Sequence, residues 1–188
     1  MPFDSNQLAN EAILLMGGDQ NSVTGQSPTF DDSTAGNALK QLYVPAFRAV
    51  LRQFGWDFSR AAFTLVLSPN VPPFPYTYEY LYPPLAVQLN SLLSAADDVN
   101  NPIPYNYNVA NAVVNGVQQR VIWAYLVNAL CRFTNAPNEN TIDDLFHASF
   151  VRLLSSALAM AIGGKPDVAQ AMLQSGSAFE QVGESRSD

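Results

Sequence analysis

The chain has 188 residues, of which 48% are hydrophobic and only 13% are charged, and its formal net charge is −7. This apolar content can build a folded core, which excludes a globally disordered chain, and the length predicts one domain over residues 1–188. The basic residues are scattered, and none lies between Ala61 and Gln119. A positive stripe that follows a nucleic-acid backbone is therefore excluded, and the low charge content is typical of a surface used in assembly.

The compartment and membrane signals of the sequence are weak. Cys131 is the single cysteine, so no disulfide framework exists, and folding in a reducing compartment is expected. The start MPFDSNQLANEAILLMGG has no basic segment ahead of its short apolar run, so we expect no signal peptide. No segment reaches about 18 consecutive apolar residues, so we expect no transmembrane helix.

Helical periodicity comes first along the chain and returns near its end. Apolar side chains at spacings of three and four predict four helices, over about 4–16, 33–54, 141–162 and 166–180. A polar tail, about 181–188, is expected to be flexible.

Capping residues and breakers set the ends of these helices. Asp4 or Ser5 can cap the first helix, which Gly17 and Gly18 then end. The residues that can cap the second helix are Asp31, Asp32 and Ser33. Pro45 predicts a kink or a break inside that second helix. Thr141 is expected to cap the third helix.

The middle of the chain, about 62–128, predicts a β-rich insertion. FTLVLSPN reads as a strand that ends in a turn, and a second strand alternates tyrosines with other residues until Pro83 and Pro84. Asn115-Gly116, flanked by valines, predicts a β-hairpin. Residues 90–112 give no clear prediction. The expected fold class is α+β, mainly α: a bundle of about four helices with a small antiparallel β-region in the middle of the chain.

The sequence contains few residues suited to catalysis. With His147 and Cys131 as the single histidine and cysteine, a Cys/His zinc site cannot form within one chain. Three acidic pairs occur, Asp31-Asp32, Asp97-Asp98 and Asp143-Asp144. They are interpreted as helix caps or solvated loop residues rather than as the carboxylates of a glycosidase. We therefore expect no catalytic residue, no cofactor and no bound metal.

Four tyrosines form the clearest candidate site, at Tyr76, Tyr78, Tyr80 and Tyr82. A tyrosine combines apolar area with a polar group, so outward tyrosines on a strand suit contact with a neighbouring subunit. The alternative is a platform on which carbohydrate or nucleic-acid rings stack. The lack of nearby lysine or arginine favours the subunit interface.

The order of several short motifs resembles the head-to-tail adaptor (connector) family of tailed phages, the group that includes tail tubular protein A of short-tailed phages. The motifs are LANEAILLMGG near the start, the long helix that ends in FGWDFSR, YEYLYPPLAV at 78–87 and DDLFHASFVRLLSSALA at 143–159. The family's aromatic signature is matched by Phe54, Trp56 and Phe58, with Arg60 as the basic residue that follows. Pro84, Leu85 and Ala86 stand where the family has an acidic residue soon after the proline, which is a departure.

This resemblance implies a structural virion protein at the head-tail junction, assembled in the host cytoplasm, and not an enzyme. It implies a dodecameric ring under the portal protein, with the tail nozzle or tail tube protein below, and DNA passing through the lumen without specific binding or any membrane. The tyrosine strand would then contact a neighbouring subunit. Phe179 and Val182 would anchor a C-terminal segment that orders on the portal. A tail-associated glycan hydrolase and a monomeric helical binding module are the alternatives.

The resemblance also predicts that the aromatic signature is structural, with its rings wedged between the strands and the late helices. Trp56→Ala should then lower the free energy of unfolding by roughly 3 to 5 kcal/mol, because it removes a large buried side chain. A thermal melt measures this loss. A melt of Trp56→Ala that coincides with the wild-type melt would contradict the expectation.

Overall fold

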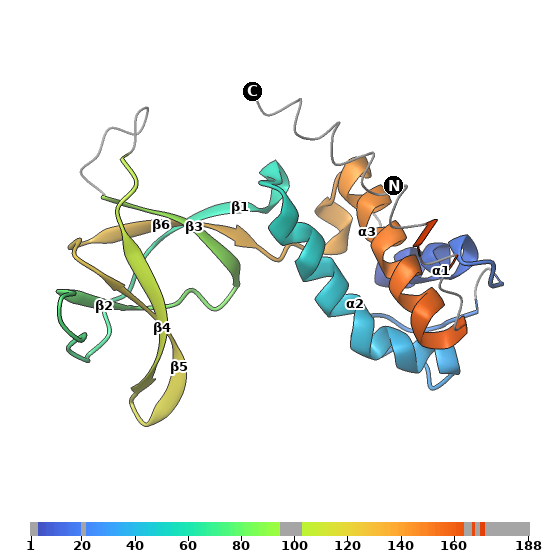
Figure 1. Cartoon of the computed structure of the whole chain (residues 1–188), viewed down its shortest axis with the longest axis horizontal. Helices are drawn as coiled ribbons and strands as arrows, with labels where there is room; N and C mark the ends of the chain where they lie inside the picture. Colours follow the sequence, from blue (N-terminus) through green and yellow to red (C-terminus); the bar gives the residue numbers. More distant parts are fainter. Residues whose placement is uncertain (1–3, 20–21, 95–102, 164–166, 168–169, 172–188) are drawn as a thin grey trace. The chain divides into compact units, whose positions relative to one another are not determined.

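The computed structural model describes residues 4–19, 22–94, 103–163, 167, 170 and 171. The chain divides into two compact units (Figure 1). The helical unit comprises Met1–Phe54 and Pro137–Asp188, and the β unit comprises Gly55–Ala136. The β unit is therefore an insertion between two segments that together make the helical unit.

The helical unit is built from three α-helices in the described residues: α1 (Ser5–Leu15), α2 (Thr34–Gln53) and α3 (Asp144–Leu158). A short 3-10 turn lies at Glu139–Thr141, and a π-helical turn, Ala159–Gly163, follows α3; a second 3-10 turn, Asp57–Ser59, lies in the β unit. Asp4, Ser33 and Asp143 cap the three helices through side-chain oxygens that accept backbone N–H groups. Gly17, with a φ of 86°, ends α1 as predicted.

Aromatic rings fill the core between α2 and α3. The ring of Phe47 meets the rings of Phe146 and Phe150 edge to face, at 5.0 and 5.2 Å between centroids. Tyr43 meets Phe150 in the same way at 5.1 Å. Edge-to-face pairs are favourable beyond their buried area. These contacts give α2 and α3 a fixed relation to one another inside the unit.

In its described residues, the β unit contains six strands, arranged in two three-stranded antiparallel sheets. The strands are β1 (Arg60–Thr64), β2 (Tyr78–Leu81), β3 (Ala86–Ser94), β4 (Tyr107–Val114), β5 (Val117–Ala124) and β6 (Ala129–Asn135). One sheet has the order β1-β6-β3 and the other β2-β5-β4. Asn115 and Gly116, both with positive φ, form the turn between β4 and β5, which confirms the predicted hairpin.

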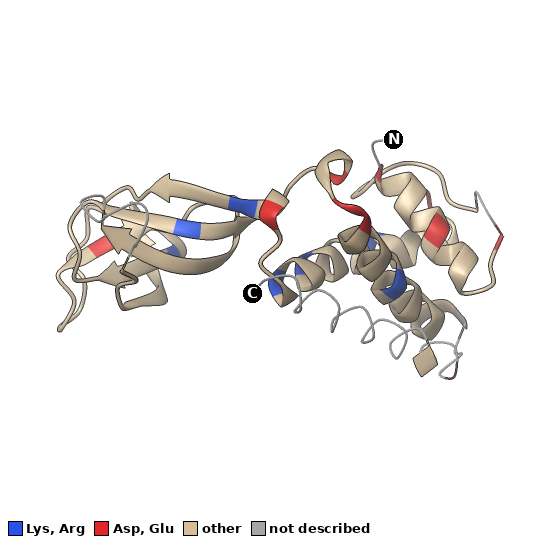
Figure 2. Cartoon of the chain, turned by 90° about the horizontal axis from the view of Figure 1, so that it is seen from above, with Lys and Arg blue, Asp and Glu red and all other residues tan. Residues whose placement is uncertain are grey.

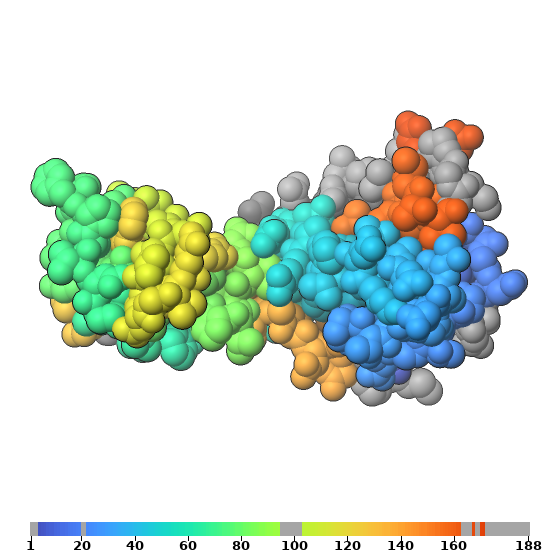
Figure 3. Space-filling model, turned by 90° about the horizontal axis from the view of Figure 1, so that it is seen from below, coloured from blue at the N-terminus to red at the C-terminus, as the bar shows by residue number. Residues whose placement is uncertain are grey.

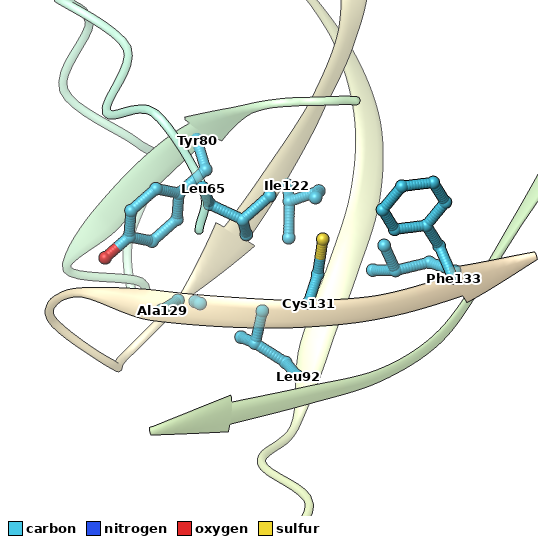
Figure 4. Close-up of a cluster of buried hydrophobic side chains, with 9 residues drawn as sticks. Leu65, Tyr80, Leu92, Ile122, Ala129, Cys131 and Phe133 are labelled. Carbon is cyan, nitrogen blue, oxygen red and sulfur yellow. The ribbon is translucent and has the colours of Figure 1, made fainter. Parts of the chain in front are cut away.

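The two sheets pack as a β-sandwich around one apolar core. Leu65, Ile122 and Cys131 lie in this core, with Tyr80, Phe133 and others around them (Figure 4). The sheets are also joined at both sides. The segment after β1 bridges β2 through Leu67 and Tyr80, and β3 bridges the start of β4 through Leu92 and Tyr105. Residues of the inserted segment thus enclose an interior of their own.

The predicted bundle of about four helices, mainly α, is wrong. Among the described residues there are three α-helices and six strands in two sheets, with 39% helix and 28% strand, so the fold is a more even α+β fold. Two strands, β3 and β6, were not predicted. The alternation of β3 is broken by irregularities between Ala86 and Gln88 and between Leu89 and Ser91. The strand β6 begins just past the predicted end of the β-rich insertion.

Two local predictions are also corrected. Thr141 does not cap α3, because residues 139–141 form a 3-10 turn and the Asp143 carboxylate accepts the N–H of Phe146 at 2.7 Å instead. Of the kink or break predicted at Pro45, the break is wrong, because the helix α2 runs through this residue. Proline has no N–H group, so Pro45 cannot donate to the carbonyl of Gln41, four residues earlier in the helix. Both residues are exposed, so water can donate to that carbonyl instead.

Part of the predicted C-terminal structure lies outside the described residues. Of the helix expected over 166–180, the structure describes only Asp167, Gln170 and Ala171, which are helical. Phe179, Val182 and the tail 181–188 are not among the described residues.

One helical stretch, Asp144–Ile162, passes a test for membrane spans by length and composition alone, with a mean hydropathy of 1.6. This is weak evidence for a span, because the buried helix of a folded core passes the same test. In this helix Phe146, Phe150, Leu154 and Leu158 are fully buried. The pattern is that of a core helix, against which α1 and α2 pack.

Hydrogen bonds from α1 and Asp31 shape the loop between α1 and α2. Asn10 exchanges hydrogen bonds with the backbone of Val23, at 2.9 and 3.1 Å. The Asp31 carboxylate accepts the backbone N–H of Thr24 at 2.6 Å and that of Ser33 at 3.0 Å, as well as the hydroxyls of both residues. These bonds favour the ionised form, so the pKa of Asp31 lies well below its usual value.

This lowered pKa predicts a loss of stability in acid. The contribution of Asp31 is fully present above its unfolded pKa of about 4 and is lost as the pH falls towards the folded pKa. Asp31→Asn removes the titrating group, so its unfolding free energy should fall less steeply than that of wild type between about pH 4 and pH 2. Urea unfolding across this range measures both slopes. Parallel slopes would contradict the role given to Asp31.

Candidate functional site

The predicted tyrosine interface separates into buried and surface residues. Tyr80 is fully buried in the core of the sandwich, and its hydroxyl donates to the Leu126 carbonyl at 2.6 Å. Tyr78 and Tyr82 are partly buried against the same core. Tyr76 precedes β2 and packs with other rings at the surface. The alternation therefore directs three tyrosines towards the interior, and Tyr80 offers no surface to a partner.

The residues of the aromatic signature lie around the junction between the two units in the sequence. Phe54 is the half-buried C-cap of α2, and Trp56 is only 7% exposed. The rings of Trp56 and Phe58 lie 5.9 Å apart, and the Trp56 carbonyl accepts the Ser59 hydroxyl at 2.9 Å. Arg60 is exposed and pairs with Asp57 at 3.1 Å. These contacts stabilise the local fold of this segment.

The most exposed apolar side chains occur in the β1–β2 loop, defined here as residues 65–77. Val71 is 92% exposed and Phe74 is 97% exposed, with prolines on both sides of Phe74. The space-filling view shows this part of the chain, in green, as a projecting knob (Figure 3). A valine and a phenylalanine held out in this way add no stability to the isolated chain, so the loop is a candidate contact site.

A buried carboxylate fixes the base of this loop. Glu79, on β2, is 3% exposed and accepts three side-chain hydrogen bonds. Its Oε1 receives the Ser68 hydroxyl at 2.7 Å and the Asn70 amide at 3.0 Å, and its Oε2 receives the Trp123 indole N–H at 2.8 Å. Ser68 also donates its backbone N–H to the Glu79 carbonyl at 2.8 Å. Both oxygens of the Glu79 carboxylate thus accept hydrogen bonds, and this network holds the base of the loop in place. The positions of the exposed Val71 and Phe74 are therefore preorganised.

Three aromatic rings cover the sheet beside this network. Tyr76 lies 5.9 Å from Trp123 and 5.3 Å from Tyr125, measured between ring centroids. Tyr125 is 53% exposed, and Trp123 is partly buried. We call Tyr76, Trp123 and Tyr125 the aromatic cluster. Because Tyr76 belongs to the β1–β2 loop, the cluster connects the end of this loop with the end of β5.

The β unit carries very little charge. Figure 2 shows the sandwich almost entirely in tan, with few coloured residues. Its charged residues are Asp57, Arg60, Glu79, Asp97, Asp98, Arg120 and Arg132. Glu79 is buried, and Arg120 lies 3.9 Å above the ring of Tyr82. Association through this surface would require little desolvation of charge.

Where they are described, the acidic pairs take structural roles, although Ser33, and not Asp31 or Asp32, caps α2. Asp31 organises its loop, Asp32 pairs with Lys40 at 2.6 Å, and Asp143 caps α3 with Asp144 in the first turn. Asp97 and Asp98 lie outside the described residues. In the parts of the chain that the structure describes, no group of three or more His, Cys, Asp or Glu side chains is placed to hold a metal ion.

The single histidine and the single cysteine lie in different units. His147 on α3 pairs with Glu11 on α1, with 2.6 Å between His147 Nε2 and Glu11 Oε2. Cys131 is fully buried in the sandwich core, and desolvation raises the pKa of its thiol to about 11. A buried thiol with a raised pKa is a poor nucleophile at neutral pH. Its contacts are those of a small core residue.

Comparison with protein-family models and with curated proteins finds no match for this chain.

Sequence reasoning did not identify Glu79 or the β1–β2 loop as functional residues. Glu79 stands in the tyrosine alternation at a position whose side chain faces away from the core, where an exposed acid is the ordinary expectation. The segment NVPPFP could have indicated an exposed apolar loop, because its two apolar residues lie among prolines between two strands, where no buried position is available to them. The partners of Glu79 are far apart in sequence and could not be paired without the fold.

The network around Glu79 predicts a stability effect that an exposed acid would not show. Glu79→Gln replaces one acceptor oxygen by a donor, so at least one of the three donors loses its partner, which should cost about 1 to 3 kcal/mol. The matched control is Asp57→Asn, which alters an exposed ion pair and should cost less than about 1 kcal/mol. Urea unfolding followed by tryptophan fluorescence measures both. Equal stability of Glu79→Gln and wild type would rule out the network.

Proposed function

We propose that this protein is a structural adaptor of a tailed-phage virion, whose copies form a ring between the portal protein and the tail nozzle or tail tube protein. DNA passes through the ring without specific binding. The order of the motifs in the sequence, from LANEAILLMGG to DDLFHASFVRLLSSALA, supports this proposal by its resemblance to the adaptor family. The proposal treats the chain as a structural component and assigns it no catalytic step.

One observation carries the proposal furthest, namely the apolar side chains that the β unit holds in solvent. Each of the following is at least 46% exposed: Phe63, Val66, Leu67, Val71, Phe74, Leu85, Ile103, Val113, Val117, Tyr125 and Val127. Exposed apolar side chains that lie together mark interaction sites on proteins, and Val66, Leu67, Val71 and Phe74 all belong to the β1–β2 loop. In a ring, each subunit meets a neighbour on two different faces, and both faces can bury exposed apolar side chains.

The charge of the chain suits a passage for DNA. The net charge is −7, and Lys and Arg are absent from Ala61 to Gln119. A phosphate backbone is attracted by clustered basic residues and is repelled by an acidic wall. A ring of such subunits would therefore let DNA slide through without holding it.

The proposal is tested by mass photometry of the purified chain, alone and mixed with portal complexes, at near-physiological salt. We expect portal particles to gain the mass of a whole ring of 20.5 kDa subunits. Phe74→Ser should weaken this gain, or the subsequent binding of the tail protein, without lowering the melting temperature, because Phe74 is almost fully exposed. Leu14→Ser is the matched control, since Leu14 is also exposed but lies in the helical unit.

A chain that stays monomeric and never joins portal particles would contradict the proposal. That result would favour a monomeric binding module, and release of sugars from bacterial glycan by the pure chain would favour the hydrolase.

A further inference from the structure

In the described part of the β unit, β1, β3 and β4 each have an outer edge that no other strand covers along its whole length. The strand β3 is interrupted by irregularities between Ala86 and Gln88 and between Leu89 and Ser91, and such bulges keep edge strands from pairing. The registers of β1 and β4 have no such irregularity. The strand β4 pairs with β5, and β1 pairs with β6. Each also makes one contact beyond its partner, through Tyr105 before β4 and through residues 66–68 after β1. Between these contacts, the outer edges of β1 and β4 remain open.

The hydrogen-bond alternation identifies the open groups on β4. The N–H of Tyr82 donates to the carbonyl of Arg120, so the even-numbered residues of β5 point their backbone groups towards β2. The backbone groups of the odd-numbered residues of β5 therefore point towards β4, where they pair with those of even-numbered residues. On β4 the N–H and C=O groups of Tyr107, Val109 and Asn111 face outward. At one end of this row the Val113 carbonyl accepts from Asn70, and at the other the Tyr105 N–H donates to Leu92.

The strand β1 shows the same alternation of inward and outward backbone groups. The N–H of Leu65 donates to the carbonyl of Ala129, so Ala61, Phe63 and Leu65 point their backbone groups towards β6. The groups of Ala62 and Thr64 then face outward. The outward carbonyl of Val66, the next in this row, accepts the N–H of Leu81 on β2.

Neither edge carries the features that keep edge strands of monomeric proteins apart. Such edges usually contain lysine, proline or an inward-pointing charge. The β4 sequence YNVANAVV has no charge and no proline, and in β1, RAAFT, the first residue alone is charged. Open strand edges of this kind are templates for another strand.

We infer that the open edge of β4 in one copy pairs with the open edge of β1 in the next copy, which joins neighbouring sandwiches by backbone hydrogen bonds. This inference rests on the proposed ring and names the contact that closes it. Because β1 and β4 are different strands, the contact is head-to-tail and can close into a ring. In an antiparallel pairing, directly paired residues have their side chains on one face, so the exposed Ala62 and Thr64 would lie beside Tyr107 and Val109, whose side chains pack against the core of their own sandwich.

Cross-linking between copies tests the pairing. Copies with Ala62→Cys are mixed with copies that carry Asn111→Cys, assembled on portal complexes, and treated with a short bismaleimide. Both positions are exposed, whereas the native Cys131 is buried. We expect a cross-linked dimer from the mixture and not from either population alone. The matched control pairs Ala62→Cys with Gln88→Cys on β3, which is also exposed and should give no dimer.

A proline variant tests the backbone groups themselves. Asn111→Pro removes an outward N–H and leaves the ladder to β5 intact, so the melting temperature should stay close to that of wild type. Ring formation should weaken at least about tenfold, the loss expected from one or more interface hydrogen bonds. Asn111→Ala keeps the N–H and should assemble as wild type does.

The outcomes separate this inference from the proposed function. If rings form but Asn111→Pro assembles normally and no mixed dimer appears, the edge pairing is overturned while the adaptor proposal stands. If the wild-type chain forms no ring, both are overturned. If Asn111→Pro does not fold, the cross-linking result alone decides.

Discussion

The β unit depends on the pairing of β6 with strands on both of its sides. In the sheet β1-β6-β3, β6 is the middle strand, so β1 and β3 are held through it. Its inward residues Ala129, Cys131 and Phe133 supply one wall of the core, and Ile122 and Tyr80 from the other sheet supply the opposite wall. Without β6 this sheet would not exist and the inner face of the second sheet would have nothing to cover it.

This arrangement explains why so much apolar area stays outside. Two three-stranded sheets enclose a narrow interior, which the core residues already fill, and short strands give their remaining valines, leucines and phenylalanines no buried position. Their exposure is compatible with a stable fold because the inner core and the Glu79 network provide the stability. Exposed apolar groups and low charge are then available for assembly.

The helical unit differs from the β unit in how its apolar side chains divide between core and surface. Its core is made of interlocking rings from α2 and α3, and its polar network serves the loop between α1 and α2. Fewer of its large apolar side chains are exposed among the described residues, with Leu14, Leu15, Val44 and Met160 as the examples. The unit therefore resembles an ordinary globular core, and the surface suited to assembly is concentrated in the β unit.

The helices could be predicted because their signals are local. Asp4, Ser33 and the glycines after α1 lie next to the residues whose backbone they satisfy, and the Asn115-Gly116 turn needs only its own positive φ values. The strands β3 and β6 could not be predicted in this way. The first has an irregular register and the second gains its identity from partners about 40 to 70 residues earlier in the chain.

At the candidate site, too, local features could be predicted from the sequence and long-range contacts could not. The tyrosine alternation predicted a strand at the right place, but which face is buried depends on the second sheet, and that sheet placed Tyr80 inside. Glu79 acquired its role from Trp123, Ser68 and Asn70, which tertiary structure alone brings together. Local patterns therefore located the strand, and long-range packing decided which of its residues are exposed.

The measurement that tests the central claim most directly is hydrogen-deuterium exchange of the chain before and after it joins portal particles. The account predicts that amides in 107–111 and in the β1–β2 loop become protected on assembly, while those in the middle of α3 stay as slow as before, because their hydrogen bonds are already buried. Unchanged exchange throughout the β unit, together with new protection confined to the helices, would contradict the claim that the sandwich is the assembly surface.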